Sequence, residues 1–167
     1  MKLYVMRHGP AEDVASSGRD SDRALTPSGR ERVRVVAKAL LDGDEAPMSI
    51  VSSPYVRALQ TAEIVAGVTN LAERGGTVVT RRELESGRSV ETQNAFVTEL
   101  LLAKKKRVMV VGHEPDLSLL VAQLVGHAPA LGMQKAMVVG LQLRDGVPTK
   151  LRFVLHPTSL QWDRADD

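Results

Sequence analysis

Short apolar runs alternate with longer amphipathic stretches along most of the chain. Apolar runs of roughly four to eight residues that are bounded by turn signals are typical of buried strands. Six segments fit this description: Leu3–Met6, Met48–Ser52, Thr77–Thr80, Val108–Gly112, Met137–Leu143 and Leu151–Leu155. Strands that alternate with helices favour a largely parallel sheet with helices on both faces. The pattern therefore predicts an α/β protein built as a three-layer α/β/α sandwich.

Helical patterns separate the first strands. A hydroxyl residue followed by proline is a common helix start, because the hydroxyl can cap the helix and proline fits its first turn. We expect helices that begin at Thr26–Pro27, at Ser53–Pro54 with Ser53 as the cap, over residues Glu91–Lys104, and at Pro115. The last two strands have no helix between them, and Asp145–Gly146 is a hairpin signal. That edge of the sheet should be antiparallel.

Length and composition narrow the class of protein. The chain of 167 residues is 43% hydrophobic, enough for one core, so we expect a single domain over residues 1–167. No run approaches the roughly 18 apolar residues of a membrane helix, and the chain opens directly into a strand pattern without a signal segment. We expect a cytoplasmic protein that does not bind membranes. Aromatic residues make up only 3% of a chain with net charge +2, which disfavours nucleic-acid binding.

Candidate chemistry follows the apolar runs. In an open α/β sheet, ligands bind beyond the carboxyl ends of the strands. Arg7 and His8 follow the first run, Arg57 lies one helical turn after Ser53–Pro54, and His113 follows the fourth run. Two histidines and two arginines should therefore lie in one site at the carboxyl ends of the strands.

These residue types suit phosphoryl transfer to histidine. A neutral imidazole such as His8 offers one lone pair for attack if its other nitrogen is held as a donor. The guanidinium groups of Arg7 and Arg57 match phosphate geometry, and His113 can donate to a phosphoryl oxygen. Gly9 should permit a tight turn and leave room for a ligand near the backbone.

Four motifs in order resemble those of the histidine phosphatase superfamily, which has a phosphoglycerate mutase-like fold. They are Arg7–Gly9 (RHG), Leu25–Gly29 (LTPSG), Ser52–Ala62 (SSPYVRALQTA) and Gly112–Pro115 (GHEP). The short chain looks most like the SixA-type phosphohistidine phosphatases. The resemblance implies a covalent phosphohistidine on His8, a phosphate pocket formed by Arg7, Arg57 and His113, and no metal or cofactor. It also implies that the substrate is a phosphohistidine-bearing protein of the phosphorelay or phosphotransferase type.

Three further residues each have a candidate role in the site and an alternative to it. Many members of the superfamily carry an acidic proton donor after the third strand, where Glu83 and Glu85 both lie. Glu83 fits that position better, although a loop carboxylate paired with a neighbouring arginine is an equal alternative. Arg23 either reaches the rim of the pocket or is a solvated loop arginine. Ser53 is a helix cap whose hydroxyl could also touch phosphate.

The sequence also bears on metal binding, on the remaining histidines and on two alternative functions. No histidine pair has a metal-ligand spacing, so we predict no metal site. His127 and His156 lie outside the motifs and are expected to be structural or exposed. The same site could act on small phosphate monoesters, or could bind phosphate without turnover. Neither the oligomeric state nor closure of the polar loop Ala11–Ala24 over the site can be predicted.

Overall fold

Seven strands form one sheet in the computed structural model, which describes residues 1–127 and 132–165. The order across the sheet is β3-β2-β4-β1-β5-β6-β7. The parallel part contains β3 (Val78–Thr80), β2 (Ser49–Ser52), β4 (Arg107–Gly112) and β1 (Lys2–Arg7). The antiparallel part contains β5 (Val138–Arg144), β6 (Val147–Leu155) and β7 (Trp162–Arg164). The mostly parallel sheet with an antiparallel edge is confirmed, and β7 is a strand that the sequence did not predict.

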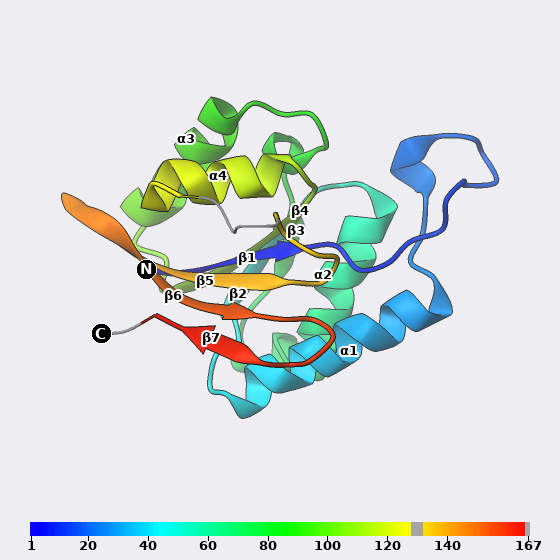
Figure 1. Ribbon diagram of the computed structural model, residues 1–167, viewed down its shortest axis with the longest axis horizontal. Coiled ribbons are helices and arrows are strands. Elements are labelled where there is room, and N and C mark those ends of the chain that lie inside the picture. The colour runs from blue at the N-terminus through cyan, green and yellow to red at the C-terminus, as the bar shows by residue number, and fades with distance from the viewer. Residues whose placement is uncertain (128–131, 166–167) are drawn as a thin grey trace.

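Within the described residues, four α-helices cover the sheet in two layers (Figure 1). Helices α1 (Pro27–Asp42) and α2 (Val56–Val68) pack over one face. Helices α3 (Val90–Leu102) and α4 (Asp116–Val125) pack over the other. Successive residues of β1 serve the two layers in turn, since Tyr4 joins the first core and Leu3 joins the second. The predicted three-layer sandwich is confirmed.

Helix boundaries agree with the sequence at one hydroxyl–proline pair and not at the other. Thr26 caps α1, because its Oγ1 accepts a hydrogen bond from the Gly29 N–H at 2.9 Å. The expected start at Ser53–Pro54 is wrong, since α2 begins at Val56 with Tyr55 as its N-cap residue. The chain still turns at Ser53, where its Oγ accepts a hydrogen bond from the Tyr55 N–H. Ser53 is not the N-cap residue of α2, and its hydroxyl has a contact in the site that is described below.

The connections that the structure describes include three short 3₁₀ helices: η1 (Asp20–Asp22), η2 (Ala72–Arg74) and η3 (Arg82–Leu84). The first of these lies within the Ala11–Ala24 loop, and the third follows β3. None of the described helices has the length and apolar character needed to cross a bilayer.

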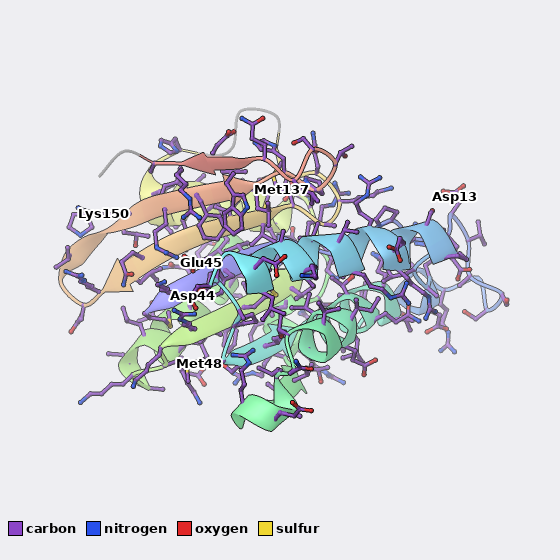
Figure 2. The ribbon with its side chains drawn as sticks, turned by 90° about the horizontal axis from the view of Figure 1, so that it is seen from below. Asp13, Asp44, Glu45, Met48, Met137 and Lys150 are labelled. Atoms are coloured by element: carbon purple, nitrogen blue, oxygen red, sulfur yellow. The ribbon has the colours of Figure 1, made fainter. Side chains whose placement is uncertain are left out.

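A buried ion-pair cluster lies at the amino ends of the parallel strands. Glu45 is only 4% exposed, and its carboxylate accepts hydrogen bonds from the Tyr4 hydroxyl and the Arg152 guanidinium. Figure 2 shows Glu45 and Asp44 at one end of α1, and Asp13 beyond the other. The two ends of the molecule therefore carry different groups of charged side chains.

Candidate active site

The carboxyl ends of β1 and β4 place the two histidines next to each other. These strands are parallel neighbours in which Arg7 pairs with Gly112, and the His8 N–H donates to the Gly112 carbonyl at 3.2 Å. The ring centroids of His8 and His113 are 5.4 Å apart. His8 is 5% exposed and His113 is 2% exposed, so both residues are buried at this end of the sheet.

Two contacts assign the tautomer of His8. Its Nδ1 lies 2.7 Å from the Gly9 carbonyl oxygen, which can only accept, so Nδ1 carries the proton. Its Nε2 lies 3.3 Å from Nε of Arg57, which can only donate. The lone pair of His8 is thus on Nε2, the nitrogen that faces Arg57.

Burial keeps both imidazoles neutral. Desolvation, reinforced by the positive charges of Arg57 and Arg7, lowers the pKa of His8 to about 4 in spite of its hydrogen bond to Gly9. Desolvation also lowers the pKa of His113 to about 3, with His8 and Arg57 adding to the effect. His8 is therefore an unprotonated base at neutral pH, as a nucleophile must be.

Arg57 is a buried cation whose donors converge on the site. It lies in the first turn of α2 and is 3% exposed. Its Nη1 donates to the backbone carbonyl of Asp20 at 2.8 Å, and its Nη2 donates to the carboxylate of Asp20 at 3.1 Å. The η1 segment thus holds the guanidinium from the side opposite to His8.

A chain of contacts through Glu114 holds Arg7. The Nη1 of Arg7 donates to the Met133 carbonyl at 2.9 Å. The Met133 N–H in turn donates to the Glu114 carboxylate at 3.2 Å, and Ser118 donates to the same carboxylate through its N–H and its hydroxyl. Glu114 therefore anchors the segment that orients Arg7.

Ser53 holds the second histidine. Its Oγ lies 2.8 Å from Nε2 of His113. Nδ1 of His113 is buried and has no hydrogen-bond partner among the described residues. The ring also packs against Tyr55 with centroids 4.9 Å apart. Ser53 is thus a partner of His113 rather than a helix cap.

A cavity of about 400 Å³ opens in front of these groups. Its lining contains four basic residues, three acidic residues and the two histidines. The lining residues are Arg7, His8, Ala11, Asp13, Asp20, Arg23, Arg57, Ser86, His113, Glu114 and Lys135. The structure therefore brings His8, Arg7, Arg57 and His113 together as the sequence indicated, and it places Arg23 in the same lining.

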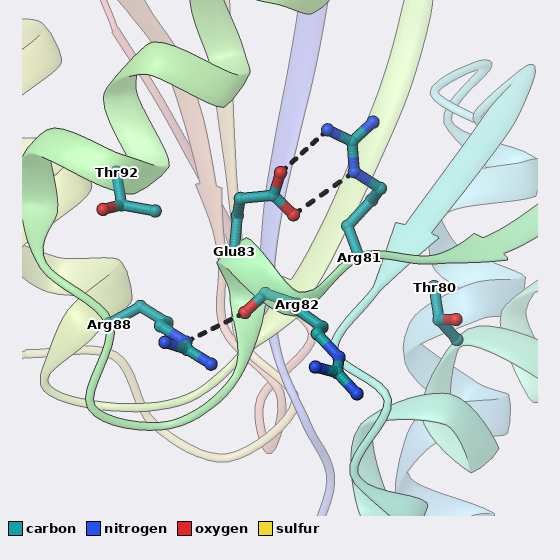
Figure 3. Close-up of a pocket in the computed structure, with 6 residues that line it drawn as sticks. All are labelled: Thr80, Arg81, Arg82, Glu83, Arg88 and Thr92. Carbon is teal, nitrogen blue, oxygen red and sulfur yellow. Dashed lines mark hydrogen bonds and ion pairs between the residues drawn. The ribbon is translucent and has the colours of Figure 1, made fainter.

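Glu83 lies in a different hollow. Figure 3 shows it in η3, paired with Arg81 and surrounded by Thr80, Arg88 and Thr92. Its carboxylate accepts from Arg81 at 2.8 Å and 3.2 Å, and this hydrogen bonding holds the pKa of Glu83 below its usual range. Glu85 is likewise absent from the cavity lining, whereas Ser86 is part of it. The structure thus does not bring either carboxylate to His8.

Gly9 is required by packing. A Cβ at Gly9 would lie 2.6 Å from Cγ2 of Val33 in α1, and Gly9 is not in the cavity lining. Its N–H donates to Oγ1 of Thr61 at 3.0 Å, so it links β1 to α2. The room that glycine leaves is filled by α1, and a contact of Gly9 with substrate stays a prediction.

Several lining residues were missed by the sequence analysis. Asp20, Asp13 and Lys135 belong to polar segments with no periodic pattern, so no local signal marks them. Glu114 could have been found, because it stands next to His113 in the fourth motif. His127 is exposed, and His156 pairs with Asp163 on the surface at 2.6 Å, so both lie away from the site.

The described part of the chain, residues 1–127 and 132–165, contains no group of three or more His, Asp or Glu side chains arranged to hold a metal ion. The cavity lining instead offers four basic side chains. An anionic ligand group is the complement of this lining.

Comparisons with known proteins identify the relatives of the chain. Residues 3–85 match the model of the histidine phosphatase superfamily (branch 1). The chain is 28% identical to phosphohistidine phosphatase SixA of Escherichia coli (strain K12), over 99% of each chain. It is 37% identical to an uncharacterized protein of Picosynechococcus sp. (strain PCC 7002) over 70% of this chain and 68% of that protein.

A solved structure of the protein histidine phosphatase SixA in complex with tungstate superposes on the chain with a TM-score of 0.86. The two are 27% identical, and the match covers 96% of this chain and 100% of that one. The overlap confirms the predicted phosphoglycerate mutase-like fold and the SixA-type resemblance.

Proposed function

The chain belongs to the histidine phosphatase superfamily, and from this premise we propose that it is a phosphohistidine protein phosphatase that works through a covalent phosphohistidine on His8. The observation that carries the proposal is the state of His8. Its imidazole is neutral, its proton is held on Nδ1 by the Gly9 carbonyl, and its Nε2 lone pair lies beside a buried arginine.

In the first step, the hydrogen bond from Nε of Arg57 to Nε2 of His8 breaks, and the freed lone pair on Nε2 attacks the phosphorus of the substrate. The P–N bond of the substrate breaks, and its electron pair goes to the departing ring nitrogen. A substrate imidazole that carries a proton on its other nitrogen leaves as neutral imidazole, while His8, which keeps its Nδ1 proton, becomes a phosphorylated imidazolium. The charge balances without a proton transfer, because the substrate imidazolium becomes neutral while the His8 imidazole becomes an imidazolium.

In the second step, water attacks the phosphorus and the bond to Nε2 of His8 breaks. The electron pair returns to Nε2, and the products are neutral His8 and dihydrogen phosphate. The Gly9 carbonyl supports both steps, since it holds the Nδ1 proton throughout and fixes the ring orientation.

Arg7, Arg57 and His113 meet the charge of the transferring group. Both guanidinium groups line the cavity, and pre-positioned donors of this kind provide most of the catalysis in phosphoryl transfer. Their guanidinium donors are the groups that would neutralise phosphoryl charge in the transition state, and the proposal assigns no step to a metal ion.

The position of Glu83 favours P–N over P–O cleavage. An alkoxide leaving group needs a general acid, and Glu83 is held ionised by Arg81 outside the cavity. A protonated phosphoimidazole needs no such acid. The position of Glu83 accordingly supports a phosphohistidine substrate over a small phosphate ester, and similarity to a phosphohistidine phosphatase supports a protein of the phosphorelay or phosphotransferase type as its carrier.

Rapid-quench labelling of the wild type and His8→Ala tests the proposal. Each protein is mixed with a phosphohistidine-bearing protein and, separately, with an alkyl phosphate, and both released phosphate and acid-labile label on the enzyme are followed. We expect label and turnover in the wild type only, with preference for phosphohistidine and at least about a 10³-fold loss of rate in His8→Ala.

Other outcomes separate the competing functions. Turnover of the alkyl phosphate alone would keep the covalent mechanism but identify a small-molecule phosphatase. Binding of phosphoprotein without label or turnover would identify a phosphate-binding module.

A further inference from the structure

Asp20 places a carboxylate between two arginines of the site. One oxygen, Oδ2, accepts from Nη2 of Arg57 at 3.1 Å, and the other, Oδ1, accepts from Nε of Arg23 at 2.9 Å. The backbone carbonyl of Asp20 accepts a third bond from Nη1 of Arg57 at 2.8 Å. Asp20, Arg23 and Arg57 all line the cavity, so the phosphate-binding arginine already has an anionic partner there.

The loop that carries Asp20 is tied to the body of the protein. Nη1 of Arg23 donates to the Glu12 carbonyl at 3.1 Å, and the Glu12 carboxylate accepts from the Ala24 N–H at 3.0 Å. A bridge joins Ala11 to Leu25 at the base of the loop. These contacts hold the Asp20 carboxylate in place even though 59% of its side chain is exposed.

This arrangement leaves part of Arg57 free. Arginine has five N–H donors, of which Nε contacts His8 and two more contact Asp20. The remaining donors can take phosphoryl oxygens while Asp20 stays in place. A bound phosphoryl group would then share the cavity with the negative charges of Asp20 and of Asp13, which is exposed in the same lining.

The charge of the leaving group decides how a substrate meets these carboxylates. A serine or alkyl ester brings the negative phosphoryl group and an uncharged leaving group, so the carboxylates only repel it. A protonated phosphohistidine brings the same phosphoryl group together with an imidazolium cation, which the carboxylates attract. The same negative charge therefore disfavours the uncharged ester more than the protonated phosphohistidine.

We propose that Asp20 is a specificity-determining residue, which selects N-phosphorylated side chains with a positively charged leaving group over uncharged phosphate esters. The inference rests on the proposed function and deepens it, since it assigns substrate choice to a residue outside the His8, Arg7, Arg57 and His113 set. Asp20 acts through its charge and also as a positioning residue for Arg57.

Asp20→Asn tests this role, because asparagine keeps the size and one acceptor but removes the charge. The probes are two peptides of the same sequence, one with phosphohistidine and one with phosphoserine. We expect the ratio of kcat/KM for the phosphohistidine peptide to that for the phosphoserine peptide to fall about three- to tenfold, the effect of one unit charge near the leaving group. The matched control is Asp22→Asn, in the same 3₁₀ helix but paired with Arg19 outside the cavity, and it should leave the ratio unchanged.

An equal loss on both peptides would overturn the inference, because a purely structural role moves both rates together. If Asp20→Asn does not fold, Asp13→Asn provides the same test, with a smaller fall in the ratio expected and an unchanged ratio counting against the inference. Failure of the wild type to hydrolyse phosphohistidine would overturn the proposed function itself. Wild-type turnover through labelled His8 with an unaltered ratio in Asp20→Asn would overturn only the role of Asp20.

Discussion

Two buried clusters of charged and polar groups lie at opposite ends of the parallel strands, and they use their hydrogen bonds differently. At the amino ends, the Glu45 carboxylate is met by Tyr4, Arg152 and Lys2. At the carboxyl ends, His8, Arg57 and His113 contact one another only in part and face a cavity. In the first cluster the Glu45 carboxylate is hydrogen-bonded by neighbouring side chains, whereas the second cluster has N–H donors beside the cavity that can bind a ligand.

The titration of the two clusters reflects this difference. Burial opposes the charged form of Glu45, but hydrogen bonds from Arg152 and Tyr4 outweigh it and lower the pKa of Glu45 to about 2. Among the described residues, no carboxylate forms a hydrogen bond to His8 or His113, and burial outweighs the attraction of Asp20 for His113, so both imidazoles stay neutral. A paired charge stabilises the fold, whereas an unpaired neutral base is reactive.

The largest expected effect is the acid sensitivity of the histidine cluster. Below the usual histidine pKa of 6.5, the unfolded chain binds protons that folded His8 and His113 do not bind until their pKa values of about 4 and 3. The free energy of unfolding should therefore fall as pH drops from 6.5 towards 4, by about 2 kcal/mol for each imidazole at pH 5. Urea unfolding across this range measures the fall.

The same titration predicts the acid limb of catalysis. Because His8 stays neutral in the folded protein, kcat/KM corrected for substrate ionisation should hold until pH approaches about 4. An acid limb at pH 6.5 in the folded enzyme would contradict the buried, neutral His8.

The next largest effect concerns Glu45→Gln, which removes the charge that Arg152 and Lys2 face. We expect a loss of about 3 kcal/mol in the free energy of unfolding, with kcat unchanged, since the partly buried cations Arg152 and Lys2 lose their counter-charge and none of the three residues lines the cavity. The control is Asp44→Asn, whose carboxylate is 93% exposed and should matter by less than about 0.5 kcal/mol. Glu45 has a lowered pKa, so its contribution is present above pH 4.5 and is lost as pH falls towards 2. A comparable loss of unfolding free energy in both variants would contradict a stabilising role for the Glu45 cluster.

The smallest expected effect is that of Glu83→Gln. Since Glu83 pairs with Arg81 outside the cavity, kcat for phosphohistidine hydrolysis should change by less than about twofold. Steady-state assays with phosphohistidine and an alkyl phosphate check this expectation. A much larger loss on the alkyl phosphate alone would restore Glu83 as a general acid.

Local sequence patterns determined most of the scaffold and the centre of the site. Strand and helix periodicities depend on neighbours a few residues apart, so the order of elements and the carboxyl ends of β1 and β4 could be read directly. Arg7 is the last residue of β1, His8 and His113 directly follow β1 and β4, and Arg57 follows a turn, which is why their meeting could be predicted. The strand β7 was missed because three residues with one apolar side chain give no period.

Only the tertiary structure decided which side chains complete the site. Asp20 reaches Arg57 across 37 positions, and Met133 holds Arg7 across 126, distances in sequence over which no periodic pattern extends. Glu83 and Ser86 lie three residues apart, yet the turn of η3 directs only Ser86 to the cavity. Glu45 similarly reads as a loop carboxylate until folding surrounds it with residues from β1 and β6. The sequence thus determined the scaffold and the reactive residues, while long-range contacts decided the partners that set their charge and orientation.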